Sequence, residues 1–173
     1  MKEINEITKK EDVYPSEIIK GLDIIYSDSA VVKTHITAPL MKHFTVNIKE
    51  PYEEMPEGVY IEFFNEKNEV KSTMKAKYAI RYDQTKKMEA RDHVVVVNEN
   101  GETLLTDQLV WDELTRKIKT YSKVTICTKK DTIRGSGMEA NEDFSEWEIT
   151  KPVGNFGVND STEKKNDSIT PKK

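Results

Sequence analysis

Hydrophobic and polar residues alternate with a period of two along much of the chain, as they do in β-strands that bury one face. In the segment 59–63, Val, Ile and Phe alternate with Tyr and Glu, and the segments 32–38 and 70–77 follow the same pattern. Short polar stretches rich in Asn, Asp, Ser and Gly separate these segments, as turns between antiparallel strands do. One short helix is expected over 16–20, where Ser16 is a good N-cap. The pattern therefore predicts an all-β, antiparallel fold.

The amino-acid composition supports this fold class. The chain of 173 residues contains 14 Val, 15 Ile and 16 Thr, but only 6 Ala and 6 Leu. β-Branched side chains are stiff at χ1 and fit a pleated sheet, whereas Ala and Leu favour helices. The imbalance argues against a helical bundle and against a helix-layered α/β enzyme. A chain of this length is expected to form one domain.

A repeat of about 30 residues organises the strands. Residues 86–97 align with residues 116–127 at a shift of 30, and residues 80–83 align with residues 109–112 at a shift of 29. One such unit cannot bury its apolar face alone, so neighbouring units must stack. Hairpin-like units stacked in this way give a β-roll that folds over on itself. Its interior is either a long apolar groove with open ends or the filled core of a closed β-sandwich, and both alternatives stay open.

The alternation also predicts which side chains point into the roll. Tyr82 and Trp111 take equivalent places in the repeat, and Trp147 lies near the next one. Their rings would either pack in a core or line a space for an apolar ligand. The predicted inward residues are Val32, Ile36, Val59, Ile61, Phe63, Met74, Ile80, Tyr82, Val94, Val96, Leu109, Trp111, Val124, Ile126 and Met138.

The chain lacks the motifs of common catalytic and metal sites. His35, His43 and His93 are far apart and do not have the spacing of a metal-binding motif. The single cysteine, Cys127, ends a strand pattern without a local signature of an activated thiol. The acidic residues between 50 and 57 are interrupted by two prolines and are typical of an exposed loop. We therefore expect no catalytic residue, no metal and no cofactor, and a protein that is not an enzyme.

Charge and hydropathy exclude two further classes. The net charge of −4 gives no electrostatic reason to expect nucleic acid as a partner. No run approaches the roughly 18 apolar residues of a membrane span. The first twelve residues, MKEINEITKKED, have no apolar core of a signal peptide.

The order of several short motifs resembles the lipopolysaccharide export protein LptC and its OstA-like relatives. I-x-Y-D begins at Ile80, G-E-T-L at Gly101 and W-D at Trp111. I-R-G-S-G-M-E-A-N then begins at Ile133, and F-S-E-W-E-I begins at Phe144.

This similarity covers about residues 22–157. The stretch 135–149 is closer to LptC than to LptA, the soluble bridge protein that has the same roll. The acidic insertion around 49–57 resembles that of the longer LptC proteins of the Bacteroidetes type.

The resemblance implies a slightly open β-jellyroll, or β-taco, in the periplasm at the inner membrane, held there by an N-terminal anchor that this chain does not contain. It implies a non-enzymatic protein that receives lipopolysaccharide from an ABC transporter of the LptB–LptF–LptG type and passes it to an LptA-like bridge protein. The acyl chains of lipid A would lie against the inward residues given above. The end strands would pair with those of the partner rolls.

Polar segments bound the predicted roll. Residues 1–12 are expected to be a flexible linker, residues 13–157 the LptC-like domain, and residues 158–173 a disordered tail that holds too few apolar side chains to pack. The alternative function is a closed structural or adhesive β-sandwich of the cell envelope without a lipid ligand.

Overall fold

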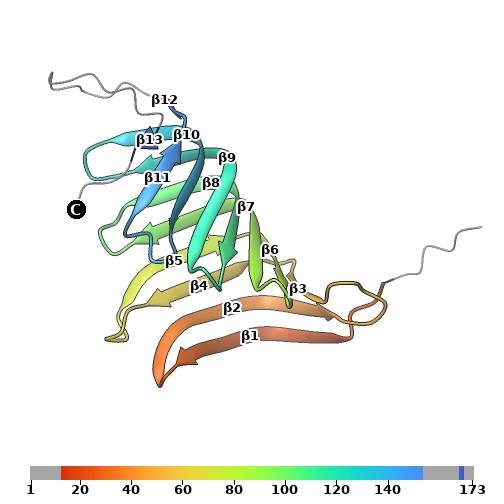
Figure 1. Ribbon diagram of the computed structural model, residues 1–173. Coiled ribbons are helices and arrows are strands. Elements are labelled where there is room, and N and C mark those ends of the chain that lie inside the picture. The colour runs from red at the N-terminus through yellow and green to blue at the C-terminus, as the bar shows by residue number, and fades with distance from the viewer. Residues whose placement is uncertain (1–12, 154–167, 170–173) are drawn as a thin grey trace, which may run out of the picture.

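Residues 13–153 and 168–169 are described by the computed structural model, and every regular element among them is a β-strand (Figure 1). The strands stack from β1 at the bottom of the view to β10–β13 at the top, in one antiparallel sheet. This confirms the predicted all-β, antiparallel fold. The strands are β1 (Glu17–Asp28), β2 (Val31–Phe44), β3 (Tyr52–Met55), β4 (Val59–Phe64), β5 (Val70–Ala76), β6 (Tyr78–Tyr82), β7 (Lys87–Asn98), β8 (Thr103–Asp112), β9 (Lys117–Cys127), β10 (Thr132–Asn141), β11 (Trp147–Thr150), β12 (Pro152–Val153) and β13 (Ser168–Ile169).

The sheet is folded lengthwise, because its long strands change neighbours about halfway along. β7, for example, pairs with β6 through Lys87–Arg91 and with β5 through Val95–Asn98. We call the two halves of the folded sheet wall A and wall B. Wall A contains β3, β6 and β11, wall B contains β4, β5 and β12, and the strands β2 and β7–β10 contribute one half to each. The result is a jellyroll-like roll with a crease on one side and, where the strand ends of both walls meet, a mouth on the other.

Left-handed backbone and breaks in strand register mark the crease. Asp92 and His93 in β7 have φ angles of 60° and 55°, and the register with β8 shifts at this point. Gly58, between β3 and β4, has a φ angle of 102°, and a Cβ atom there would lie 3.0 Å from the main-chain oxygen of Ala76. Bulges of this kind bend a strand and increase its twist, which lets the sheet turn the corner.

The two walls bury one continuous apolar core between them. Among its largest fully buried members are Phe63, Met74, Leu104 and Ile126. The rings of Phe63 on wall B and Trp111 on wall A are nearly perpendicular, with their centroids 5.0 Å apart. Each fully buried side chain of this size stabilises the fold by about 1.5–3 kcal/mol. The walls are therefore in direct contact through their own side chains.

The strand register bears out the longer part of the predicted repeat. Lys87 of β7 and Lys117 of β9 both pair with Asp112 of β8, so they are equivalent at a shift of 30. The residues before them, Lys86 and Arg116, both have left-handed backbone, with φ angles of 53° and 55°. The two turns are therefore built alike.

The short helix expected over 16–20 is wrong, because β1 begins at Glu17. The hydroxyl of Ser16 lies 2.6 Å from the Thr45 hydroxyl and accepts a hydrogen bond from the Thr45 amide, so it fixes the start of β1 against the end of β2 instead of capping a helix. The predicted linker, residues 1–12, lies outside the described residues. The predicted tail, residues 158–173, also lies outside them apart from the two residues of β13.

Candidate functional site: the interior and mouth of the roll

Most of the residues predicted to point inward are buried between the walls. The buried residues are Ile36, Val59, Ile61, Phe63, Met74, Val94, Val96, Leu109, Trp111, Val124, Ile126 and Met138. Val32, by contrast, is only half-buried near the start of β2, where its amide donates to the Asn68 side chain. They come from both walls and form the apolar interior.

The inward prediction is wrong for Ile80 and Tyr82. In β6 the buried side chains are Ala79 and Arg81, and the Tyr82 ring lies on the outer face beside that of Tyr52, with centroids 6.4 Å apart. The register shows the cause, since Arg81 pairs with Met88, which pairs with Trp111. The repeat therefore continues here at a shift of 30 instead of 29, and Arg81, not Tyr82, is equivalent to Trp111.

Several interior residues were missing from the prediction. Met88 and Ile118 follow from the repeat, because they pair with Trp111 from either side. Phe144 could not be found from alternation, because it lies in a turn. The other omitted core residues are Leu22, Ala38, Met41, Met55, Ala76, Ala79, Ala90, Leu104, Ala140, Trp147 and Ile149.

Two rows of inward side chains face each other along the mouth. The row on wall A follows the register from His43 through Glu53, Arg81, Met88, Trp111, Ile118 and Ala140 to Trp147. The row on wall B runs through Tyr26, Thr34, Phe63, Ser72 and Asn98. Most of the buried polar residues lie in these rows or beside them, so the mouth combines polar with apolar side chains, whereas Thr106 and Thr120 lie near the crease.

Arg81 is the buried cation of the mouth. Its Nε and Nη2 atoms donate to the two oxygens of Glu113, at 2.6 and 3.0 Å. Its guanidinium carbon lies 5.9 Å from the centre of the Tyr26 ring on wall B, which is a cation–π contact across the mouth. Burial alone would lower the pKa of Arg81, but the hydrogen bond to Glu113 and the charges of Glu113 and Glu53 raise it, so the side chain stays charged. Burial also raises the pKa of Tyr26.

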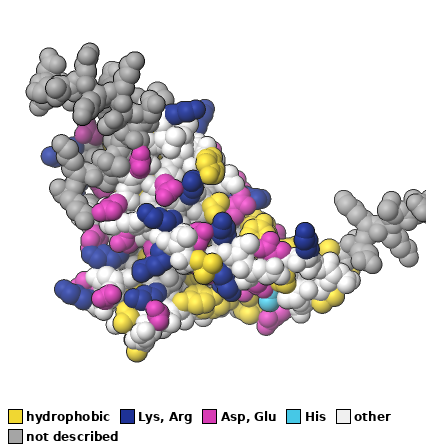
Figure 2. Space-filling view, viewed as in Figure 1, with side chains coloured by type: hydrophobic (Ala, Val, Ile, Leu, Met, Phe, Trp, Pro, Cys, Tyr) yellow, Lys and Arg dark blue, Asp and Glu magenta, His cyan; other side chains and the backbone are white. Residues whose placement is uncertain are grey.

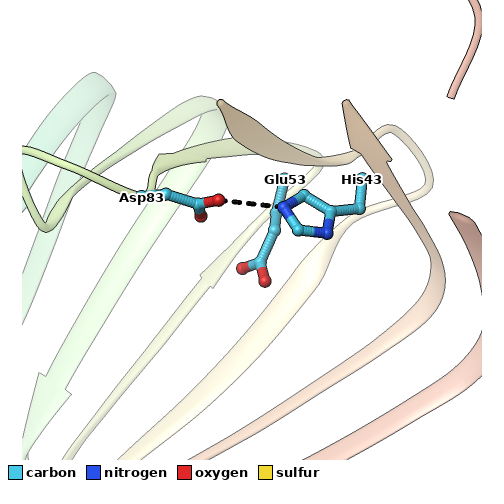
Figure 3. A group of neighbouring side chains, drawn as sticks. All are labelled: His43, Glu53 and Asp83. Carbon is cyan, nitrogen blue, oxygen red and sulfur yellow. Dashed lines mark hydrogen bonds and ion pairs between the residues drawn. The ribbon is translucent and has the colours of Figure 1, made fainter. Parts of the chain in front are cut away.

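A histidine and two carboxylates, His43, Glu53 and Asp83, form a cluster (Figure 3). His43 Nε2 and Asp83 Oδ2 are 2.9 Å apart, and one ligand atom each of His43, Glu53 and Asp83 lies within 4.8 Å of the others. Arg81 Nη1 is 3.4 Å from Glu53 and 3.7 Å from Asp83. Because the guanidinium already supplies positive charge to both carboxylates, we interpret this group as an ion-pair network and assign no metal to it.

β1 is the end strand of the stack, and among the described residues it pairs only with β2. By register with inward residues of β2, Ile19, Leu22 and Ile24 lie on the inner face, and Ile19 and Ile24 are partly exposed. Ile18 and Ile25 on the outer face are more than half exposed. In Figure 2 hydrophobic side chains gather toward these N-terminal strands, whereas charges of both signs are spread over the rest of the face. An unpaired strand edge beside apolar side chains is a template for another strand.

A small hollow opens at the mouth. Its volume is about 200 Å³, and it lies between Tyr26 and Lys33 on one side and Trp111, Glu113 and Arg116 on the other. Such a hollow is far smaller than the 300–1,000 Å³ of a typical ligand pocket.

Through the ranges 13–153 and 168–169, no helix has the length and apolar character that crossing a membrane requires.

The fold and this interior define a class of protein, a folded antiparallel β-roll with an apolar core and an end strand whose outer edge has no partner among the described residues. The model of one family, described as "Lipopolysaccharide-assembly, LptC-related", matches residues 4–154, and the chain belongs to this family. It is therefore a protein of lipopolysaccharide transport, from a non-enzymatic family of the periplasm. A comparison with curated proteins finds no match.

Proposed function

We propose that this protein is a lipid conduit, which receives lipopolysaccharide from an inner-membrane ABC transporter and passes it to an LptA-like bridge protein. The apolar interior carries the proposal, because it runs through the stack as rows of aliphatic and aromatic side chains. One such row on wall B pairs Ile36, Ile61, Met74, Val96 and Leu104 from strand to strand. Burying acyl chains against side chains of this kind yields about 0.8 kcal/mol per CH₂ group.

Acyl chains of lipid A would lie against this interior while the sugar headgroup stays at the polar mouth. The inward residues retained from the prediction, with Met88, Leu104 and Ile118 added, would contact the chains. Ile80 and Tyr82 are left out, because they belong to the outer face. The transporter supplies the energy for movement in this scheme, so the roll itself needs no nucleotide site.

Site-specific photo-crosslinking tests the conduit. A crosslinker at Val96, which is buried, should form adducts with lipopolysaccharide in cells that are exporting it. The matched control is Leu105, which lies on the neighbouring strand with 42% of its surface exposed on the outer face. Adducts at Leu105 without adducts at Val96 would contradict the inward path.

The end strand β1 would receive the end strand of a partner roll, from the transporter or from the bridge protein. Such strand addition uses main-chain hydrogen bonds and continues the walls from one protein to the next. The substitution Ile24→Asp places a charge on the inner row of β1, and Ile25→Asp places the same charge on the outer face. We expect Ile24→Asp to weaken binding of one partner at least about tenfold and Ile25→Asp to change it little. Equal effects in pull-downs with each purified partner would contradict pairing through this face.

The direct contact of the walls favours a second candidate, a closed β-sandwich that binds no lipid. Phe63 and Trp111 meet across the core, so no acyl chain fits between them without movement of the walls. The crosslinking experiment separates the two candidates, because a sandwich with a permanently filled core gives no adduct at Val96.

A further inference from the structure

The turn between β10 and β11 crosses the mouth of the roll. We call residues 141–147 the strap. It leaves wall A at Asn141 and returns to wall A at Trp147. Hydrogen bonds within it are short-range, from the Phe144 amide to the Asn141 oxygen at 2.9 Å and from the Asn141 amide to the Glu146 oxygen at 3.0 Å.

Side-chain hydrogen bonds tie the strap to wall B. The Ser72 hydroxyl donates to the main-chain oxygen of Glu142 at 2.8 Å, and the Asn98 side-chain amide donates to the main-chain oxygen of Phe144 at 3.0 Å. Trp147 Nε1 donates to Glu102 at 3.4 Å. Ser72 and Asn98 are buried, so water does not replace the strap as their partner.

The strap also carries one buried ring and one buried carboxylate. Phe144 is fully buried, and its ring stacks against that of Trp147 with the centroids 6.4 Å apart. The Glu142 carboxylate accepts hydrogen bonds from Trp111 Nε1 at 3.0 Å and from Arg116 Nε. Trp111 is the same ring that meets Phe63, so the strap is joined to the aromatic contact between the walls.

The backbone of the strap is under strain. Phe144 has a φ angle of 53°, in the left-handed region that bulky side chains avoid. Such a conformation persists only while the surroundings hold it. The packing contacts of Phe144 in the closed roll keep its backbone in this conformation. When the strap leaves the mouth, Phe144 loses these contacts and its backbone strain is relieved.

We infer that the strap is a releasable closure, which shuts the mouth of the empty roll and must leave wall B before an acyl chain enters this part of the interior. The inference rests on the proposed function, since it describes how the same interior becomes accessible. It also explains why the core is filled in a protein whose family transports a lipid. The Phe144 side chain occupies the space of an acyl chain until the strap is released.

Locking the strap tests the inference. Lys71 lies beside Ser72 on wall B, and it is close enough to Asp143 for their charges to interact. In a Cys127→Ser background, Lys71→Cys and Asp143→Cys would be joined by a short bis-maleimide. The purified full chain is then mixed with lipopolysaccharide, and uptake is measured. The controls are the two single-cysteine variants treated with the same reagent.

We expect the joined protein to take up lipopolysaccharide at least about tenfold more weakly than either control. Equal uptake by the joined and control proteins would overturn the inference and leave the proposed function intact. If no variant takes up lipopolysaccharide, including the unmodified protein, the proposed function falls and the releasable strap falls with it.

Loosening the strap gives the opposite readout. Ser72→Ala removes one bond between strap and wall B, worth about 1 kcal/mol, and should raise the rate of uptake about fivefold. The matched control is Ser145→Ala, because the Ser145 hydroxyl bonds only to Asp143 within the strap. An unchanged or lower rate for a Ser72→Ala protein that keeps the native β-sheet spectrum would contradict release.

Discussion

At the C-terminal end of the stack, Phe144, Trp147 and Ile149 are buried, whereas at the N-terminal end Ile18 and Ile25 expose 55% and 59% of their surface. The strap bonds both walls together at the first end. Within the part of the chain that the structure describes, β1 at the second end has a neighbouring strand on one side only. A strand that shields little apolar surface and leaves its edge unpaired is suited to accept a partner, while a buried turn completes the core of the protein itself.

The difference also appears in how polar groups are used. Glu142 at the strap is buried and fully bonded, so it stabilises a closed arrangement. At the other end the Tyr26 ring reaches Arg81 across the mouth but stays partly exposed. Three predictions follow from this comparison, and each places a change at one end against a matched change elsewhere.

The largest effect is expected from Phe144→Ala, which empties a fully buried site. Replacing a buried phenylalanine by alanine costs about 3–5 kcal/mol, and the Cβ of alanine keeps the strain of the left-handed backbone. The control Ile25→Ala at the N-terminal end should change the free energy of unfolding by less than about 0.5 kcal/mol. Urea unfolding of both variants measures the difference, and equal losses would mean that the two ends do not differ as described.

Arg81→Met should have the next largest effect. It leaves Glu113, Glu53 and Asp83 without their shared cation, and breaking a buried ion pair on one side costs about 3 kcal/mol. Arg91→Met is the control, because Arg91 pairs with Glu89 while 48% of its side chain is exposed, and such a pair is worth about 0–1 kcal/mol. A small loss in the free energy of unfolding for Arg81→Met would show that packing of the methionine side chain compensates for the ion pairs. The stability of the mouth would then not depend on a positive charge at this position.

The repeat predicted the architecture of the roll from sequence, because a shift of 30 places Lys87 and Lys117 opposite the same residue. Alternation also placed residues such as Ile61, Val96 and Ile126 in the core, since one face of each strand is apolar. β6 failed for a physical reason: its inner face carries a small alanine and a paired arginine, while Ile80 and Tyr82 cover the outside. Hydrophobicity alone selects the wrong face there.

The contacts at the mouth could not be predicted from the sequence, for a related reason. Its contacts join residues far apart in the chain, such as Ser72 with Glu142 and Asn98 with Phe144. Ser72 lies inside the predicted strand segment 70–77, and Asn98 is the last residue of β7. Nothing in the sequence near either residue distinguishes one that bonds to a distant strap. The ion pairs around Arg81 likewise depend on how β3 and β6 align.

The smallest predicted effect concerns His35, which joins the first two strands to β4 on the outer face. Its Nε2 atom lies 2.8 Å from Asp23 of β1 and its Nδ1 atom 3.0 Å from Glu62 of β4. The hydrogen bonds to Asp23 and Glu62 raise the pKa of His35 above its ordinary value of 6.5. Its stabilising contribution is therefore complete below about pH 6.5 and is lost as the pH rises through the raised pKa.

Because Asp23 is largely exposed, we expect this contribution to be only about 0.5 kcal/mol. Urea unfolding of the protein at pH 5.5 and 8.5, compared with His35→Gln, measures it. The difference between the two proteins should be larger at the lower pH, and Asp23→Asn should remove part of it. The hydrogen bonds described above between the strap and wall B involve Ser72, Asn98 and Glu102, so an equal pH dependence of the stability of the strap would contradict the contrast between the ends. A pH-sensitive clamp at β1 alone would instead make the N-terminal end, where a partner strand is proposed to add, the end whose local stability responds to pH.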